Sequence, residues 1–182
     1  LKHTRQNTLI MGILNVTPDS FSDGGMYSHL SKALSQAQSM EKNGADIIDI
    51  GGESTRPGAI SVSVKEEINR TIPVIEEIRK YSNIAISIDT YKSEVAEKAL
   101  LAGADFINDI SGFTFDSRMM EIVKKFDVPV VLMHIKGTPQ DMQTNPTYID
   151  VIKDLLEFFS FQTQKALDFG IKKEQIIIDP GI

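Results

Sequence analysis

The chain contains the stretch Gly44-Ala45-Asp46-Ile47-Ile48-Asp49-Ile50-Gly51-Gly52 and repeats it as Gly103-Ala104-Asp105-Phe106-Ile107-Asn108-Asp109-Ile110-Ser111-Gly112, with one inserted residue. Each copy starts with a glycine suited to end a helix, continues as a short apolar strand and finishes in polar residues. A weaker third copy covers residues 169–179. The repeat predicts parallel strands whose carboxyl ends gather polar side chains, which is where parallel α/β folds place their ligand sites.

Apolar runs and helical patterns alternate on both sides of these two copies. The apolar runs are rich in Ile and Val and predict six buried strands, at residues 9–14, 46–50, 84–88, 105–107, 128–133 and 175–178. The helical patterns between them lie at residues 31–43, 65–81, 93–102, 116–126 and 148–169. The order of elements is therefore β-α, repeated along the chain.

Helix ends can also be predicted from residue type. Gly44, Gly103 and Gly170 directly follow helical patterns and are expected to stop them. The expected N-caps are polar residues: Ser28 or Ser31 for the first helix, and Asp116 or Ser117 for the fourth.

Two architectures fit repeated β-α units, a doubly wound open sheet and a (β/α)8 barrel. A dinucleotide-binding open sheet would carry a Gly-x-Gly-x-x-Gly turn after its first strand, and this sequence has none. Six strands in 182 residues is a spacing that would complete eight strands near the roughly 250 residues typical of barrels. We expect one α/β domain over residues 1–182, holding the first six units of a TIM barrel and ending before strands seven and eight.

Composition excludes several classes of protein. Nineteen Lys and Arg against 25 Asp and Glu give a net charge of -6, so no overall basic field attracts nucleic acid. Cysteine is absent, which excludes disulfides and thiolate metal sites and is typical of a reducing compartment. No long apolar run follows the polar N-terminus, so we expect neither a signal peptide nor a membrane span, and a cytoplasmic protein.

The segments after the first two strands carry polar, glycine-rich chemistry. Residues 15–25 contain hydroxyl groups, carboxylates and one aromatic ring. The segment is either a mobile active-site lid or a solvated connection between elements. After the second strand, Thr55, Arg56 and Pro57 place a hydroxyl and an always-charged guanidinium beside a rigid turn. An arginine in a loop is usually only solvated, but this position at a strand end favours binding of phosphate or carboxylate.

Asp89, Asn108 and Asp179 are predicted at or just beyond the ends of three different strands. Strand-end capping or salt bridging is a slightly better explanation for any one of them alone. Together, two carboxylates and an amide match the hydrogen-bonding edge of an aminopyrimidine or pterin ring. Asp49 and Asp109 occupy related places but rank lower, because strand alternation turns some of these side chains into the barrel wall.

Metal chemistry has few candidates. His134 follows the fifth strand, where it can carry a proton or bind a metal, although a lone histidine is more often structural. No second histidine lies at ligand spacing, so zinc is not expected. A participating metal would be an oxygen-binding ion such as Mg²⁺, with Asn15 as its protein ligand.

These segments identify a family. Residues 11–25, and residues 44–58 with Glu53-Ser54-Thr55-Arg56-Pro57-Gly58, closely resemble the two signature segments of the dihydropteroate synthases. Further motifs follow in the family's order: Ser87-Ile88-Asp89-Thr90, Ile107-Asn108-Asp109-Ile110, Leu132-Met133-His134 and Ile178-Asp179-Pro180-Gly181. The resemblance spans the whole chain.

The resemblance implies a barrel enzyme of folate biosynthesis, a homodimer and the target of sulfonamides. Such an enzyme condenses 6-hydroxymethyl-7,8-dihydropterin diphosphate with 4-aminobenzoate, using Mg²⁺, and forms 7,8-dihydropteroate and diphosphate. The matching pterin-binding positions are Asp89, Asn108, Asp179 and Thr55. Asn15 matches the metal and diphosphate ligand, Arg56 and the lid acid Asp23 match catalytic positions, and Phe21 and Pro57 match those that enclose the aminobenzoate ring.

The sequence departs from the family at its end. The family's Ser-Arg-Lys segment on strand seven and Arg-x-His segment on strand eight have no counterpart in it. We therefore expect a fragment of a longer synthase, inactive alone. Two alternatives remain: a pterin-binding domain that passes a methyl group to a corrinoid, which would lack the segment after the first strand, and a partial barrel that binds pterin without turnover.

Overall fold

The computed structural model describes residues 8–17, 26–54, 61–137 and 147–181. Strands and helices alternate, as the sequence predicts. The elements in chain order are β1 (Met11–Asn15), α1 (Met26–Lys42), β2 (Ile47–Gly51), α2 (Val64–Arg79), β3 (Ala85–Asp89), α3 (Ser93–Ala102), β4 (Phe106–Asp109), α4 (Met119–Phe126), β5 (Val130–Met133), α5 (Val151–Phe169), the 3-10 turn η2 (Lys173–Gln175) and β6 (Ile176–Asp179).

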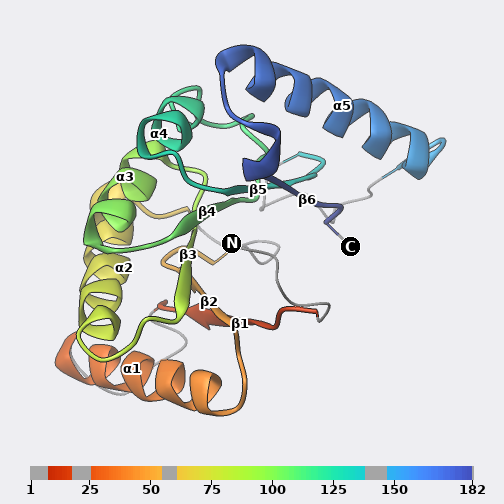
Figure 1. The fold of residues 1–182 in the computed structure, drawn as a ribbon. Helices are drawn as coiled ribbons and strands as arrows, with labels where there is room; N and C mark the ends of the chain where they lie inside the picture. Colours follow the sequence, from red (N-terminus) through yellow and green to blue (C-terminus); the bar gives the residue numbers. More distant parts are fainter. Residues whose placement is uncertain (1–7, 18–25, 55–60, 138–146, 182) are drawn as a thin grey trace.

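The six strands form one sheet in the order β1-β2-β3-β4-β5-β6, and every neighbouring pair is parallel. The sheet is curved, and helices α1 to α4 line its convex side (Figure 1). A doubly wound sheet reverses its strand order at one point and has helices on both faces. Sequential order with helices outside is the arrangement of a (β/α)8 barrel, which confirms the predicted fold class.

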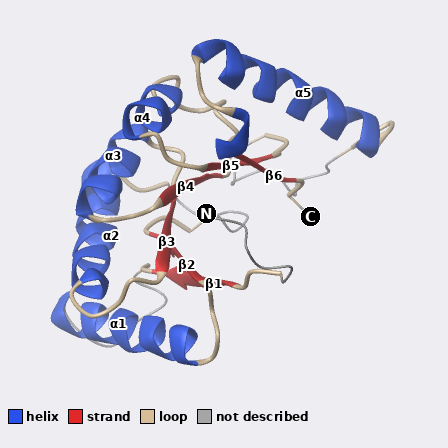
Figure 2. Ribbon diagram, in the orientation of Figure 1, coloured by secondary structure: helices blue, strands red, loops and turns tan. Residues whose placement is uncertain are grey.

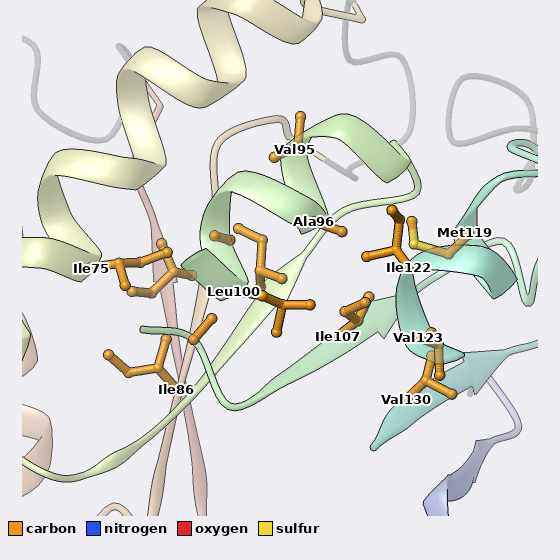
Figure 3. Packing of buried hydrophobic residues seen from close by; sticks show 14 of the residues in the cluster. Ile75, Ile86, Val95, Ala96, Leu100, Ile107, Met119, Ile122, Val123 and Val130 are labelled. Carbon is orange, nitrogen blue, oxygen red and sulfur yellow. The ribbon is translucent and has the colours of Figure 1, made fainter. Parts of the chain in front are cut away.

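Strand alternation gives the sheet an apolar outer face. Isoleucines 48, 50, 86, 88 and 107 are all completely buried there, together with Leu132 of β5. Figure 3 shows how the helices cover them, with Ile107 near Ile122 of α4 and Ile86 beside the α2 and α3 side chains. Each such side chain stabilises the fold by about 1.5–3 kcal/mol relative to exposure, so the sheet and helices form one cooperative core.

Helix ends differ partly from the predictions. Gly44, Gly103 and Gly170 follow α1, α3 and α5 with φ of 96°, 112° and 101°, the left-handed conformation that ends a helix, as predicted. The predicted N-caps were wrong: α1 starts at Met26, so Ser28 and Ser31 lie inside it, and Arg118 rather than Asp116 or Ser117 precedes α4. Asp116 instead accepts hydrogen bonds from the backbone N–H groups of Arg118 and Ser93, and so ties α4 to α3.

The two edge strands expose apolar side chains. Ile13 of β1 and Ile178 of β6 are 60% and 52% exposed, and Ile10 beside β1 is 58% exposed. The two strands stand at opposite ends of the curved sheet in Figure 2. Within the described ranges, no helix is both long enough and apolar enough to cross a lipid bilayer.

Candidate active site

Three predicted site residues fall in one row across the carboxyl ends of the strands. Asn15 pairs with Gly51 in register, Gly51 with Asp89, and Asp89 with Asn108. Gly51 keeps the row close, because a Cβ at this position would lie 3.2 Å from Asp89 Oδ2 and 3.6 Å from Asn15 Oδ1. The four-strand register therefore brings Asn15, Asp89 and Asn108 to the same level of the sheet.

The clearest indication of a ligand site is the side chain of Asp89. Its Oδ1 is buried and has no hydrogen-bond partner among the residues that the structure describes. Burial raises the pKa of Asp89 well above its ordinary value of 3.8, and the charges of Asp49 and Glu67 raise it further. A buried acceptor without a partner costs about 1–3 kcal/mol, so a ligand that offers N–H donors here recovers that free energy.

A second polar level lies beneath the row, on the same inner face. Asn108 donates from Nδ2 to Asp49 Oδ2 over 3.1 Å, and Ser87 donates from its hydroxyl to Asp49 Oδ1. Burial raises the pKa of Asp49, whereas the hydrogen bonds from Ser87 and Asn108 act in the opposite direction. Asp49 is not among the residues expected at the site, although the period-2 alternation of β2 puts residues 47, 49 and 51 on one face and so indicates its place there.

Below these polar residues the inner face is apolar. Ile47, Phe106 and Val131 form a separate buried cluster, against which Ala85 packs. Ile47 lies two residues before Asp49 and Phe106 two residues before Asn108, whereas Val131 of β5 pairs in register with Asn108 itself. The site therefore has a dry apolar base, which strengthens the electrostatic interactions of the carboxylates above it.

The other low-ranked acid, Asp109, lies on the opposite face. It accepts from the backbone N–H groups of Ser111 and Phe113 and from the Ser111 hydroxyl at 2.7–2.9 Å. Burial raises its pKa, and these hydrogen bonds oppose the rise. Asp109 thus shapes the turn after β4, as alternation predicts for a wall residue.

Asp179 and His134 lie at the ends of β6 and β5. Asp179 pairs in register with Met133, two positions beyond the row that contains Asn108, and its Oδ1 accepts from the Gly181 N–H at 2.9 Å. The His134 ring packs edge-on against Phe158 of α5, with ring centroids 5.0 Å apart. Burial lowers the pKa of His134, Asp154 partly offsets that effect and Lys136 adds to it. Its described contacts are those of a packed aromatic ring.

A buried ionic cluster that the sequence did not suggest joins the loop after β2 to the start of α3. Lys92 Nζ lies 2.6 Å from Glu53 Oε2 and 2.6 Å from Glu67 Oε2, and donates to the carbonyl of Val62 at 2.8 Å. Glu53 also accepts from the Tyr91 hydroxyl at 2.6 Å and from the Val62 N–H at 2.9 Å. Burial acts to raise the pKa of Glu53, but the hydrogen bonds from Lys92, Tyr91 and Val62 prevail and lower it.

Five predicted site residues lie outside the described residues: Phe21, Asp23, Thr55, Arg56 and Pro57. The described part of the chain brings no three His, Cys, Asp or Glu side chains together as a metal site. Asn15 places a side-chain oxygen beside Gly51 at the carboxyl end of β1, and an oxygen donor there would fit an ion that takes its other ligands from water and substrate oxygens.

Known proteins resemble this chain closely. The dihydropteroate synthase of Synechocystis is 53% identical over 177 residues, which cover 97% of this chain and 61% of that protein. A Clostridium difficile dihydropteroate synthase structure, obtained in the presence of pteroic acid, superposes with a TM-score of 0.90 at 45% identity and covers 97% of this chain and 65% of its own. The Xanthomonas albilineans enzyme with 4-aminobenzoic acid gives 0.89 at 43% identity, covering 97% and 62%.

The chain thus spans about three fifths of the length of these relatives. The model of the pterin-binding enzymes matches residues 11–182, which includes both polar levels and every strand. From this match and from the row of Asn15, Asp89 and Asn108, the chain belongs to the pterin-binding enzyme family.

Proposed function

We propose that the protein carrying this chain is a dihydropteroate synthase. It would condense 6-hydroxymethyl-7,8-dihydropterin diphosphate with 4-aminobenzoate and release diphosphate. The observation that carries the proposal is the buried Oδ1 of Asp89, which has no hydrogen-bond partner within the described ranges and lies in one row with Asn108 and Asn15. Relatives named dihydropteroate synthase, one of them solved with 7,8-dihydropteroate, support it.

The pterin ring would be recognised through its hydrogen-bonding edges. Its amino group and ring N–H groups are donors, and a carboxylate accepts two of them at once. Asp89 supplies such a carboxylate at the sheet end, Asn108 supplies an amide that both donates and accepts, and Asp179 supplies a second carboxylate from β6. Thr55 would add a hydroxyl from the second loop.

The diphosphate would lie near Asn15, at the carboxyl end of β1. Asn15 would hold Mg²⁺ by its side-chain oxygen, and the ion when bound neutralises charge on the diphosphate. Arg56 is always charged and would stabilise the same oxygens as the leaving group departs. The aminobenzoate ring would be enclosed by Phe21 and Pro57, with Asp23 on the closing segment.

The reaction would be a dissociative displacement at the exocyclic methylene carbon. The bond from this carbon to the diphosphate oxygen breaks first, and the electron-rich ring stabilises the developing cation. The amine nitrogen of 4-aminobenzoate then forms the new C–N bond and loses a proton. Asp23 and Phe21 would exclude water, which would otherwise capture the cation as the alcohol.

The test is diphosphate release by the intact protein that carries this sequence, with Mg²⁺ and the pterin diphosphate, in the presence and absence of 4-aminobenzoate. We expect release that depends on the aminobenzoate. Asn15→Ala should lower kcat/KM by at least tenfold, whereas Asn43→Ala, on an exposed turn after α1, should leave it unchanged. Release without aminobenzoate, or none at all, would contradict the proposal.

Assembly and location are proposed with the function. We propose a homodimeric protein in which residues 1–182 belong to one domain. A cytoplasmic location is supported by the absence of cysteine. Analytical ultracentrifugation of the intact protein would test the dimer.

A further inference from the structure

Asp49 is a buried acid that the mechanism above does not use. Only 3% of its surface is exposed, and it lies on the inner face of β2 between Ile47 of the apolar base and Gly51 of the row. An acid at such a depth is costly unless hydrogen bonds compensate it. Its partners therefore indicate what it does.

Both carboxylate oxygens of Asp49 accept hydrogen bonds. Oδ1 accepts from the hydroxyl of Ser87, which is fully buried, and Oδ2 accepts from Asn108 Nδ2 at 3.1 Å. Ser87 stands directly opposite Asp49 in the register of β2 and β3, and Asn108 reaches across from β4. One oxygen of the carboxylate is thus held by Ser87, and the other oxygen accepts the hydrogen bond from Asn108.

This contact decides which way the Asn108 amide faces. An asparagine side chain has an acceptor oxygen and a donor nitrogen of nearly equal size, and a rotation of 180° exchanges them. A carboxylate that accepts on both oxygens admits only the orientation in which the NH2 group faces it. The amide oxygen and the second N–H are then left for a ligand.

We propose that Asp49 is a positioning residue that fixes the Asn108 amide, so that the site favours a heterocycle with a ring N–H beside an acceptor ring nitrogen. The inference rests on the proposed function, since it names the redox state of the pterin that the oriented Asn108 amide would select. A 7,8-dihydropterin carries a hydrogen on N8 next to N1, whereas a fully oxidised pterin has a bare acceptor at N8. The fixed amide oxygen therefore matches the reduced ring.

The test compares the binding of two probes by the intact protein, 7,8-dihydropteroate and pteroic acid, measured by calorimetry. We expect the wild type to bind the reduced compound more tightly. In Asp49→Asn, whose amide can donate or accept, the affinity for 7,8-dihydropteroate should fall about tenfold, the equivalent of one hydrogen bond, and the preference should shrink. Asp109→Asn, a buried acid on the outer face, is the matched control that should leave the preference unchanged.

A double-mutant cycle separates positioning from general damage. In an Asn108→Ala background the effect of Asp49→Asn should vanish, because no amide is left to orient. An equal loss of both compounds, or the same loss in the Asn108→Ala background, would overturn the inference. A wild type that binds neither compound would refute the proposed function and this inference with it.

A second measurement covers the case in which Asp49→Asn does not fold. In ¹⁵N spectra of the wild type, one Nδ2 proton of Asn108 should be protected from exchange before any ligand is added, and it should stay protected after 7,8-dihydropteroate binds. Free exchange of both protons would overturn the inference.

Discussion

Lys92 Nζ and Glu53 Oε2 lie 2.6 Å apart although 39 residues separate them in the chain. Lys92 is the residue directly before α3, and Glu53 follows Gly51, which ends β2, and Gly52. Glu67 of α2 binds the same ammonium group, so three elements meet at one cation whose side chain is only 13% exposed. The ion pairs of Lys92 with Glu53 and Glu67 therefore hold the loop after β2 against α2 and the start of α3.

Replacing Lys92 should therefore make the protein easier to unfold. Lys92→Met keeps the length of the side chain but leaves Glu53 and Glu67 buried together without a cation, which should lower the free energy of unfolding by about 3 kcal/mol. Urea unfolding of the variant and the wild type measures this. Lys125→Met breaks the exposed pair with Glu97 and should change it by no more than about 0.5 kcal/mol; similar losses in both variants would contradict the prediction.

Asp89 should lower stability while it serves binding. Burial, and then the charges of Asp49, Glu67, Asp109 and Glu53, raise its pKa, so the folded protein holds a proton at pH values where the unfolded chain, near 3.8, has released it. The free energy of unfolding then falls as pH rises above 3.8 through the raised pKa. Asp89→Asn should be more stable than the wild type at pH 7 and not at pH 3, yet bind 7,8-dihydropteroate far more weakly. Thermal melts at both pH values, with calorimetry, test this; a variant less stable at pH 7 would contradict it.

Gly51 should be needed for binding more than for folding. Its backbone lies in the row, and a Cβ there would enter the space beside Asp89 Oδ2 and Asn15 Oδ1. Gly51→Ala should therefore lower kcat/KM about tenfold with little change in melting temperature. Gly44→Ala should show the opposite pattern, since a φ of 96° strains a side chain far from the site and costs about 1 kcal/mol of stability. Equal activity losses in the two variants would count against this role of Gly51.

The edge strands should make residues 1–182, when expressed by themselves, associate with one another. Ile13 and Ile178 present apolar surface on β1 and β6, the two outer strands of the described sheet, which favours edge-to-edge contact. Sedimentation velocity should show oligomers that Ile13→Lys with Ile178→Lys reduces. Ile149→Lys, which alters a fully exposed side chain before α5, should not reduce them. A monomer that is unaffected by either change would refute the prediction.

The sequence by itself determined the order and type of the elements. The Ile-rich runs and the glycines at 44, 103 and 170 act over a few residues, because backbone conformation and strand alternation are local properties. The same alternation was enough to place Asp89 and Asn108 at strand ends, and the family motifs named the chemistry expected there. The N-cap of α4 was mispredicted because α4 begins after Arg118, and Asp116 uses one carboxylate oxygen on the Arg118 N–H and the other on the distant Ser93 N–H.

Only the tertiary structure decided the partners of the buried charges. Asp49 and Asn108 are 59 residues apart, and Lys92 lies 39 residues from Glu53, so nothing local in the sequence indicates these contacts. The curvature and register of the parallel sheet bring these residues together. Burial then makes each hydrogen bond important for stability, because a buried polar group without a partner loses its hydrogen bonds to water and gains none in exchange. Residue types set which groups can offer hydrogen bonds to a ligand, and the packing of the sheet sets which of them lie on its inner face and in what orientation.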